Sequence, residues 1–199
     1  MGRNMAKAGF SVAALKPEYE ELYKSCNFVA AKVPEISAGA AKIKNGQQRY
    51  EQLMTTTGVP WYVIGVLHYR ESTCNFNTHL YNGDPLTART VQYPPGRPTD
   101  GTPPFAFEFS AEHALKDDGF SGWTDWSLAG TLFRCESFNG FGFRAHNVHT
   151  PYLWGFSQHY TSGGFPHDHE WLDTYVNKQC GCATLLKWME VHGIIAPLT

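Results

Sequence analysis

The chain has 199 residues, which is enough for one domain with a substantial hydrophobic core. Its 16 Lys and Arg residues nearly balance its 18 Asp and Glu residues, so it lacks the excess positive charge typical of nucleic-acid binding. No stretch approaches the roughly 20 consecutive apolar residues of a membrane-spanning helix, and we expect no membrane insertion. Aromatic residues make up 15% of the chain, a high fraction that suits a large core or a groove that stacks on sugar rings.

The N-terminal region is predicted to be helical over residues 17–27 and again over 40–55, because apolar residues recur there with a helical period. The segment after Met1 is too polar for the apolar part of a secretory signal peptide. We therefore expect a protein made in the cytoplasm, with its five cysteines reduced. Residues 1–50 are interpreted as a helical extension packed on a domain that spans 51–199.

The next segment, VPWYVIGVLHY from Val59 to Tyr69, is apolar on nearly all sides. Pro60 fits the first turn of a helix, and we predict a buried central helix that runs to about Glu71. Glu71 thus ends an almost unbroken apolar run, where a carboxylate is costly to ionise. A carboxylic acid that stays protonated near neutral pH can donate its proton to a leaving group.

Residues 77–105 are rich in Gly, Pro, Asn and Thr, and we expect a short β-hairpin and a long loop. Asn82-Gly83 is a hairpin turn signal. Asp84 follows it, and the turn could bring Asp84 back toward Glu71 as the second carboxylate of a glycosidase. The alternative is that Asp84 is only a turn residue ahead of a proline. Weaker candidates for the second carboxylate are Asp100 and Asp125.

Three more helices are predicted in the second half of the chain. They cover residues 107–116, 125–137 with Thr124 as N-cap, and 180–192. Together these elements predict an α+β domain that is mainly α-helical, with a small β-hairpin after the central helix.

Several motifs occur in the order that one superfamily shows. Glu71-Ser72 resembles the Glu-Ser motif of goose-type lysozymes and soluble lytic transglycosylases. Residues 136–142, ESFNGFG, are similar to that superfamily's Ala-Tyr-Asn-Ala-Gly segment, and residues 151–160 resemble its closing motif, in which a tyrosine approaches the catalytic glutamate.

The whole region 57–160 also resembles lysozyme-like endolysins of phages and prophages. One motif of the superfamily, the Gly-Leu-Met-Gln after the glutamate, is missing. Residues 85–105 stand in its place.

The resemblance implies a lysozyme-like fold and a muramidase that cleaves the β-1,4 bond between N-acetylmuramic acid and N-acetylglucosamine in peptidoglycan. Glu71 would be the general acid, and Asp84 a base or an electrostatic stabiliser. The candidate substrate-binding residues are Ser72, His79, Asn139, Tyr152, Trp154 and Tyr160. Hydrolysis and transglycosylation, which leaves an anhydro end, both stay open. We expect a monomer that acts on glycan strands of the wall without metal or cofactor.

An endolysin of this kind reaches the wall through the hole that a holin makes. An effector delivered by a secretion machine is equally compatible with a chain that lacks a signal peptide.

The histidines indicate an alternative of another class. Five of the nine lie between residues 146 and 169, and in His167-Asp168-His169 two imidazoles would share one face of a strand. Zinc amidases and peptidases also attack peptidoglycan, with His and carboxylate ligands. No His-Glu-x-x-His motif is present.

A third interpretation is a cell-wall-binding module without catalysis. Its aromatic platforms would be Trp123, Trp126, Trp154 and Trp171. Such a module has no use for a protonated Glu71, so this interpretation predicts that Glu71→Gln changes no measured property.

Overall fold

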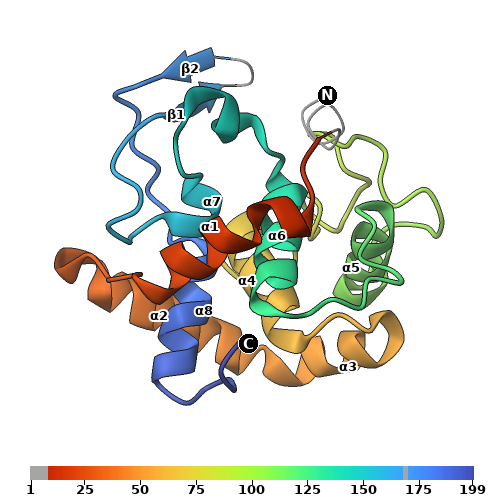
Figure 1. The fold of residues 1–199 in the computed structure, drawn as a ribbon. Coiled ribbons are helices and arrows are strands. Elements are labelled where there is room, and N and C mark those ends of the chain that lie inside the picture. Colours follow the sequence, from red (N-terminus) through yellow and green to blue (C-terminus); the bar gives the residue numbers. More distant parts are fainter. Residues whose placement is uncertain (1–8, 168–169) are drawn as a thin grey trace. The chain divides into compact units, whose positions relative to one another are not determined.

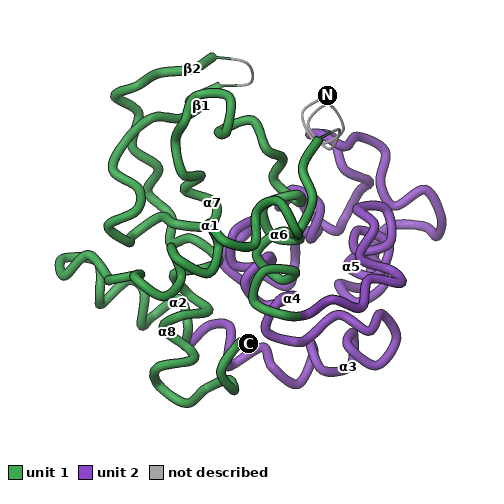
Figure 2. The backbone as a smooth tube through the Cα atoms, in the orientation of Figure 1, with its two compact units in different colours: residues 1–40, 127–199 green, residues 41–126 purple. Residues whose placement is uncertain are grey.

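The structure, a computed structural model, describes residues 9–167 and 170–199. It is mainly helical and contains a two-stranded antiparallel sheet, which confirms the predicted α+β, mainly helical class (Figure 1). The described chain divides into two compact units, shown in Figure 2. Unit 1 holds the residues up to 40 and from 127 to 199, and unit 2 holds residues 41–126. Neither boundary falls at residue 50, where the sequence suggested one.

Unit 2 is built around α4 (Trp61–Ser72), which is the predicted central helix. Every residue from Val63 to Arg70 is buried, because this stretch is apolar on nearly all faces, and the polar His68 and Arg70 are buried with it. α4 packs against α3 (Gln47–Thr57), and α3 also packs against α5 (Phe107–Asp117). The helix predicted over residues 107–116 is therefore confirmed.

The single helix predicted over residues 40–55 is wrong. The chain forms α2 (Val33–Asn45) and α3, separated at Gly46. A Cβ atom at Gly46 would lie 2.7 Å from the ring of Tyr50 and 2.9 Å from that of Phe76, so the interruption allows a close approach that only glycine permits. Helical periodicity continues across this glycine in the sequence, which is why the break was missed.

The predicted β-hairpin around Asn82-Gly83 is also wrong. Thr78 and Pro85 form one isolated bridge, and residues 73–106, all of them described, contain no strand. The turn itself is present, since the N–H of Gly83 donates to the carbonyl of His79. Proline next to the turn cannot donate to a ladder, so the pairing does not extend.

Unit 1 holds the only sheet of the described residues, formed by β1 (Gly164–His167) and β2 (Glu170–Leu172). Its helices surround α6 (Leu128–Asn139), which is buried over most of its length. α1 (Val12–Lys24) lies across α6 (Figure 1), while α7 (Pro151–Trp154) and α8 (Cys182–Val191) pack on it as well. Two short 3₁₀ helices, η1 (Ala30–Lys32) and η2 (Gly142–His146), complete the unit.

The limits of three predicted helices shift by a few residues. α1 starts five residues earlier than predicted because the Ser11 hydroxyl caps it by accepting the N–H of Ala14. The N-cap of α6 is Ser127 rather than Thr124. α8 confirms the helix predicted over residues 180–192. No helix in the described part of the chain has the length and apolarity that crossing a membrane demands.

Candidate active site

Glu71 is the last residue but one of α4 and is partly buried. The helix ends in the left-handed residue Thr73, whose N–H donates to the carbonyl of Tyr69 at 2.8 Å. The carboxyl group is therefore attached where a buried apolar helix gives way to the loop 73–106. This is the position that the sequence predicts for it.

The Asn82-Gly83 turn lies against the end of α4. A Cβ atom at Gly83 would stand 2.6 Å from the carbonyl oxygen of Glu71, and the φ of Gly83 is +79°. Both the close approach and the left-handed backbone require glycine. The structure thus brings this turn to the main chain of Glu71.

The carboxyl group of Asp84 binds the backbone of the loop, which is not the role expected of a second catalytic group. Its Oδ2 atom accepts hydrogen bonds from the N–H groups of Val91 at 2.7 Å and Gln92 at 2.9 Å. It also accepts one from Nδ2 of Asn82 at 3.2 Å. Asp84 is 8% exposed. These contacts agree better with the turn-residue interpretation than with a catalytic base, and they extend it, because Asp84 also holds a distant part of the loop.

His79 and Ser72 were expected to contact the substrate. In the structure both side chains form hydrogen bonds within the protein. His79 is fully buried, with Nδ1 2.6 Å from Oγ of Ser110 and Nε2 2.8 Å from the carbonyl of Ala88. A ring with no exposed surface and two engaged nitrogens fastens the loop to α5 rather than lining a groove. The hydroxyl of Ser72 points back to the carbonyl of His68 at 3.4 Å.

The other predicted substrate-binding residues belong to unit 1. Asn139 is exposed at the end of α6. Tyr152 and Trp154 lie in α7 and are 4% and 1% exposed. The Tyr160 hydroxyl donates to the carbonyl of Gly163 at 3.0 Å and accepts the N–H of Asn177 at 3.0 Å. Of these four side chains only Asn139 presents a polar group at an exposed position.

A second glutamate, Glu136 near the end of α6, was not predicted as functional. It is 2% exposed and receives the Tyr19 hydroxyl at 2.5 Å. Arg144 donates to both of its oxygens, at 2.8 and 2.7 Å, and also to both oxygens of Glu18. Burial raises the pKa of Glu136 above its usual range, although the hydrogen bonds and charge of Arg144 act in the opposite direction.

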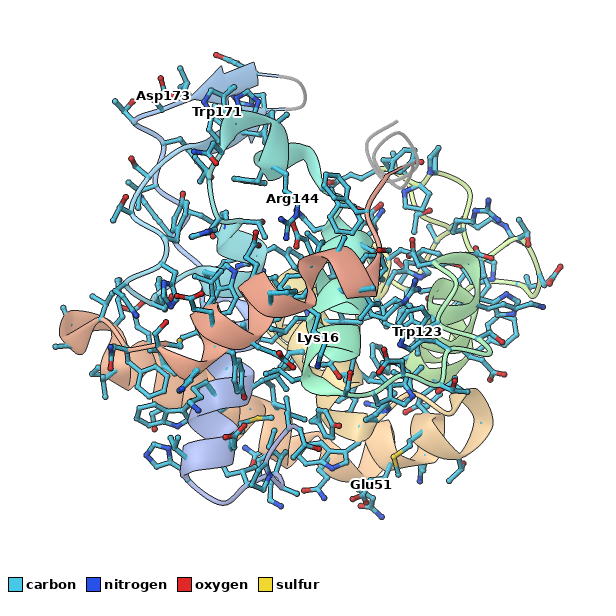
Figure 3. All side chains as sticks on the ribbon, viewed as in Figure 1. Lys16, Glu51, Trp123, Arg144, Trp171 and Asp173 are labelled. Carbon is cyan, nitrogen blue, oxygen red and sulfur yellow. The ribbon has the colours of Figure 1, made fainter. Side chains whose placement is uncertain are left out.

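This cluster borders a small pocket of about 20 Å³, which is lined by Glu18, Glu136, Arg144, Val148, His149, Thr150 and Trp154. Figure 3 labels Arg144 among these side chains. Glu18 and Tyr19 of α1 join the Arg144–Glu136 pair, so the cluster links α1 to α6. Both oxygens of Glu136 are engaged in these bonds, so the cluster does not present a proton donor. The sequence gives one weak signal for it, the pair Glu136-Ser137, and none for Glu18, which lies 126 residues from Arg144.

The described histidines of the region 146–167 form no common cluster with their acidic neighbours. His146 stacks on Trp171 at 3.7 Å, and Trp171 donates to Asp173, beside which it is labelled in Figure 3. His159 Nε2 lies 2.8 Å from the carbonyl of Leu22. Within residues 9–167 and 170–199, no group of three or more His, Cys, Asp or Glu is arranged to hold a metal ion. Of the expected pair His167 and His169, only His167 belongs to the described residues, so the pair itself lies outside them.

Comparisons with known proteins identify no family for this chain. A scan against family models, a search of curated proteins and a search of solved structures each found no match.

Proposed function

We propose that the chain is a muramidase that degrades bacterial cell-wall peptidoglycan, with Glu71 as general acid. The observation that carries the proposal is the place of Glu71, a partly buried residue at the end of a helix that is buried from Val63 to Arg70. The apolar helix and the negative end of its dipole both favour the neutral acid. A neutral acid at neutral pH is what protonation of a glycosidic oxygen requires.

In the proposed reaction, Glu71 donates its proton to the oxygen between N-acetylmuramic acid and N-acetylglucosamine as the bond breaks. Positive charge then develops at the anomeric carbon of the oxocarbenium-like transition state. The resulting Glu71 carboxylate can take a proton back from the incoming nucleophile, since the same group serves as acid and then as base. Water as nucleophile gives hydrolysis.

A lytic transglycosylase is the second candidate, and the hydrogen bonds of Asp84 favour it. Three donors occupy one oxygen of Asp84, so this carboxylate is poorly placed to activate water. A transglycosylase needs no second carboxylate, because a hydroxyl of the substrate itself attacks and leaves an anhydro end. Glu71 would have the same role in both reactions.

The test compares Glu71→Gln with Glu112→Gln, an exposed glutamate on α5 of the same unit. We expect Glu71→Gln to lower the release of sugar ends from purified peptidoglycan by about 10²–10⁴-fold, as loss of a general acid does. Its melting temperature should stay close to that of the unmodified chain, and Glu112→Gln should keep full activity.

Other outcomes would contradict the proposal, and two of them would point to a function of another class. Release of peptides without new sugar ends would mean an amidase or peptidase. Retained activity in Glu71→Gln would remove Glu71 from the chemistry, and binding to the wall without any release would leave a binding module.

A further inference from the structure

The loop between α4 and α5, residues 73–106, is unusually long for a segment with no helix or strand. Such loops in compact domains are mostly either functional or disordered. Four of its apolar side chains, Leu80, Tyr81, Leu86 and Phe105, are buried. An ordered loop of this length therefore indicates a function.

Within it, residues 90–97 form a closed subloop, which we call the 90–97 loop. The N–H of Thr90 donates to the carbonyl of Arg97 at 2.9 Å, and the N–H of Gly96 donates to the carbonyl of Thr90 at 2.8 Å. The Thr90 hydroxyl accepts the N–H of Arg97 at 2.9 Å and donates to the carbonyl of Pro94 at 2.5 Å. At the base, Arg97 pairs with Asp117 of α5 at 3.4 Å. These contacts fix the loop before any ligand arrives.

The tip of the 90–97 loop exposes side chains that the core does not use. Val91 is 82% exposed, Tyr93 is 41% exposed, and Gln92 between them is exposed too. Val91 is the most exposed of the large hydrophobic residues reported for the described chain. Two exposed apolar side chains on a fixed frame suit a binding surface, because little conformational entropy is lost when a ligand covers them.

The same turn connects this tip to Glu71. Asn82 donates through Nδ2 to the carbonyls of Gln92 at 3.1 Å and Tyr93 at 3.4 Å. Its neighbour Gly83 packs on the Glu71 carbonyl. The residue after that, Asp84, holds the N–H groups of Val91 and Gln92. Three consecutive residues thus set the position of the tip relative to the end of α4.

The chemistry of the tip fits an uncharged sugar. Residues 90–96 read TVQYPPG and carry no charged side chain, so the tip offers nothing specific to a phosphate or a cation. A phenol ring can cover the apolar face of a pyranose. An exposed amide can pair with the amide of an N-acetyl group, whose methyl would lie against a valine.

We propose that Val91, Gln92 and Tyr93 form a subsite for an N-acetyl sugar of the strand that Glu71 cleaves, with Asp84 as the positioning residue that holds this subsite. This inference rests on the proposed function and names the part of the chain that binds its substrate. The subsite lies in residues 85–105, the segment that stands in place of the Gly-Leu-Met-Gln motif.

The first arm of the test measures kcat and KM on purified peptidoglycan. Tyr93→Ala and Val91→Ser should each raise KM by roughly tenfold with kcat nearly unchanged, since each loses an apolar contact that the bound sugar would cover. Tyr93→Phe should keep the unmodified KM because the ring remains. The matched control is Val191→Ser, at a 56% exposed valine on α8.

Asp84 is tested in the same assay. Asp84→Ala should raise KM as Tyr93→Ala does, and Asp84→Asn should restore most of the affinity, because its amide oxygen can still accept the N–H groups of Val91 and Gln92. A catalytic base would behave differently, with a large fall in kcat for both variants. That pattern would overturn the positioning role.

The second arm separates this proposal from the proposed function by measuring retention on insoluble peptidoglycan in the Glu71→Gln background. We expect Tyr93→Ala to lower retention there, where no cleavage is needed. If the unmodified chain releases sugar ends but neither KM nor retention depends on Tyr93 or Val91, the subsite is wrong and the muramidase stands. If retention depends on Tyr93 while no sugar ends are released, the subsite stands as a glycan-binding site and the muramidase is wrong. Absence of any retention overturns the subsite.

Discussion

Glu71 in unit 2 and Glu136 in unit 1 occupy matching places in two buried helices. Each lies near the C-terminal end of its helix, and each precedes a serine. Their surroundings differ. Glu136 is 2% exposed and is held by Arg144 and the Tyr19 hydroxyl, whereas Glu71 is partly buried and adjoins a long ordered loop.

One sequence pattern, Glu-Ser near the end of a buried helix, can thus serve two purposes. A carboxylate that is bonded to a guanidinium through both oxygens stabilises packing, because moving it would leave a buried charge behind. A carboxyl group that is to react must reach a substrate, so it has to keep some access to solvent. Three variants and one change of pH test this contrast and the structure around the two glutamates.

The largest effect on stability is expected from Arg144→Met. It leaves Glu136 buried without its cation, and we expect the free energy of unfolding to fall by about 3–5 kcal/mol in urea titrations. Lys16→Met, which removes an exposed ion pair with Glu20 on α1, should cost less than about 1 kcal/mol. Equal effects of the two variants would mean that Glu136 does not depend on Arg144.

The pH dependence of stability should reflect His68 of α4. Burial lowers the pKa of this imidazole from 6.5 to about 4, so the folded state favours the neutral ring. The stability that His68 contributes is complete above pH 6.5 and is lost as the pH falls through 4. The loss should amount to about 3 kcal/mol, from 1.36 kcal/mol per pKa unit.

The measurement is urea unfolding between pH 7 and pH 4. His68→Asn should flatten this part of the curve, and the control His167→Asn, at an exposed position, should not. A slope that survives His68→Asn would assign the acid sensitivity to another group.

Gly83→Ala tests whether the turn next to Glu71 matters for activity. Gly83 and Gly122 have nearly the same φ, +79° and +78°, but a Cβ atom meets the Glu71 carbonyl at 2.6 Å only at position 83. Gly122→Ala should cost about 1–2 kcal/mol of stability for its left-handed backbone and leave kcat unchanged. Gly83→Ala should cost more and also lower kcat, because either the turn or the end of α4 has to move.

The smallest effect is expected from Tyr19→Phe. It removes one hydrogen bond to Glu136 while the bonds from Arg144 remain, so the free energy of unfolding should fall by about 1–2 kcal/mol. Activity per folded molecule should not change. A loss of activity without a loss of stability would move Glu136 from the structural role to a functional one.

The sequence predicted the parts of the fold that depend on local patterns. α4 was predicted because its apolar run is long and begins with a proline, and the Asn82-Gly83 turn because its residue types favour a left-handed backbone. Together they predicted that Glu71 lies where the buried helix ends and the loop begins. The break at Gly46 depends in part on a close approach to Phe76, which becomes a neighbour of Gly46 only in the folded chain.

The cluster around Glu136 shows why the rest was not predictable. Its three charged members come from α1, α6 and η2, and only folding brings Glu18 to Arg144. The task of Asp84 was hidden for a similar reason, since its partners Val91 and Gln92 become neighbours only when the loop closes. The sequence showed only a carboxylate in a turn that could return toward Glu71, and this left both a second catalytic group and a turn residue open.

The role of Glu71 is tested by mass spectrometry of the fragments that the unmodified chain and Glu71→Gln release from purified peptidoglycan. We predict that the unmodified chain releases muropeptides with new sugar ends, and that Glu71→Gln releases almost none. Reducing ends would mean hydrolysis, and anhydro ends, about 18 Da lighter by one water, would mean transglycosylation with Glu71 as acid and then base. Equal release by both proteins, or no new sugar ends from either, would contradict the assignment of Glu71.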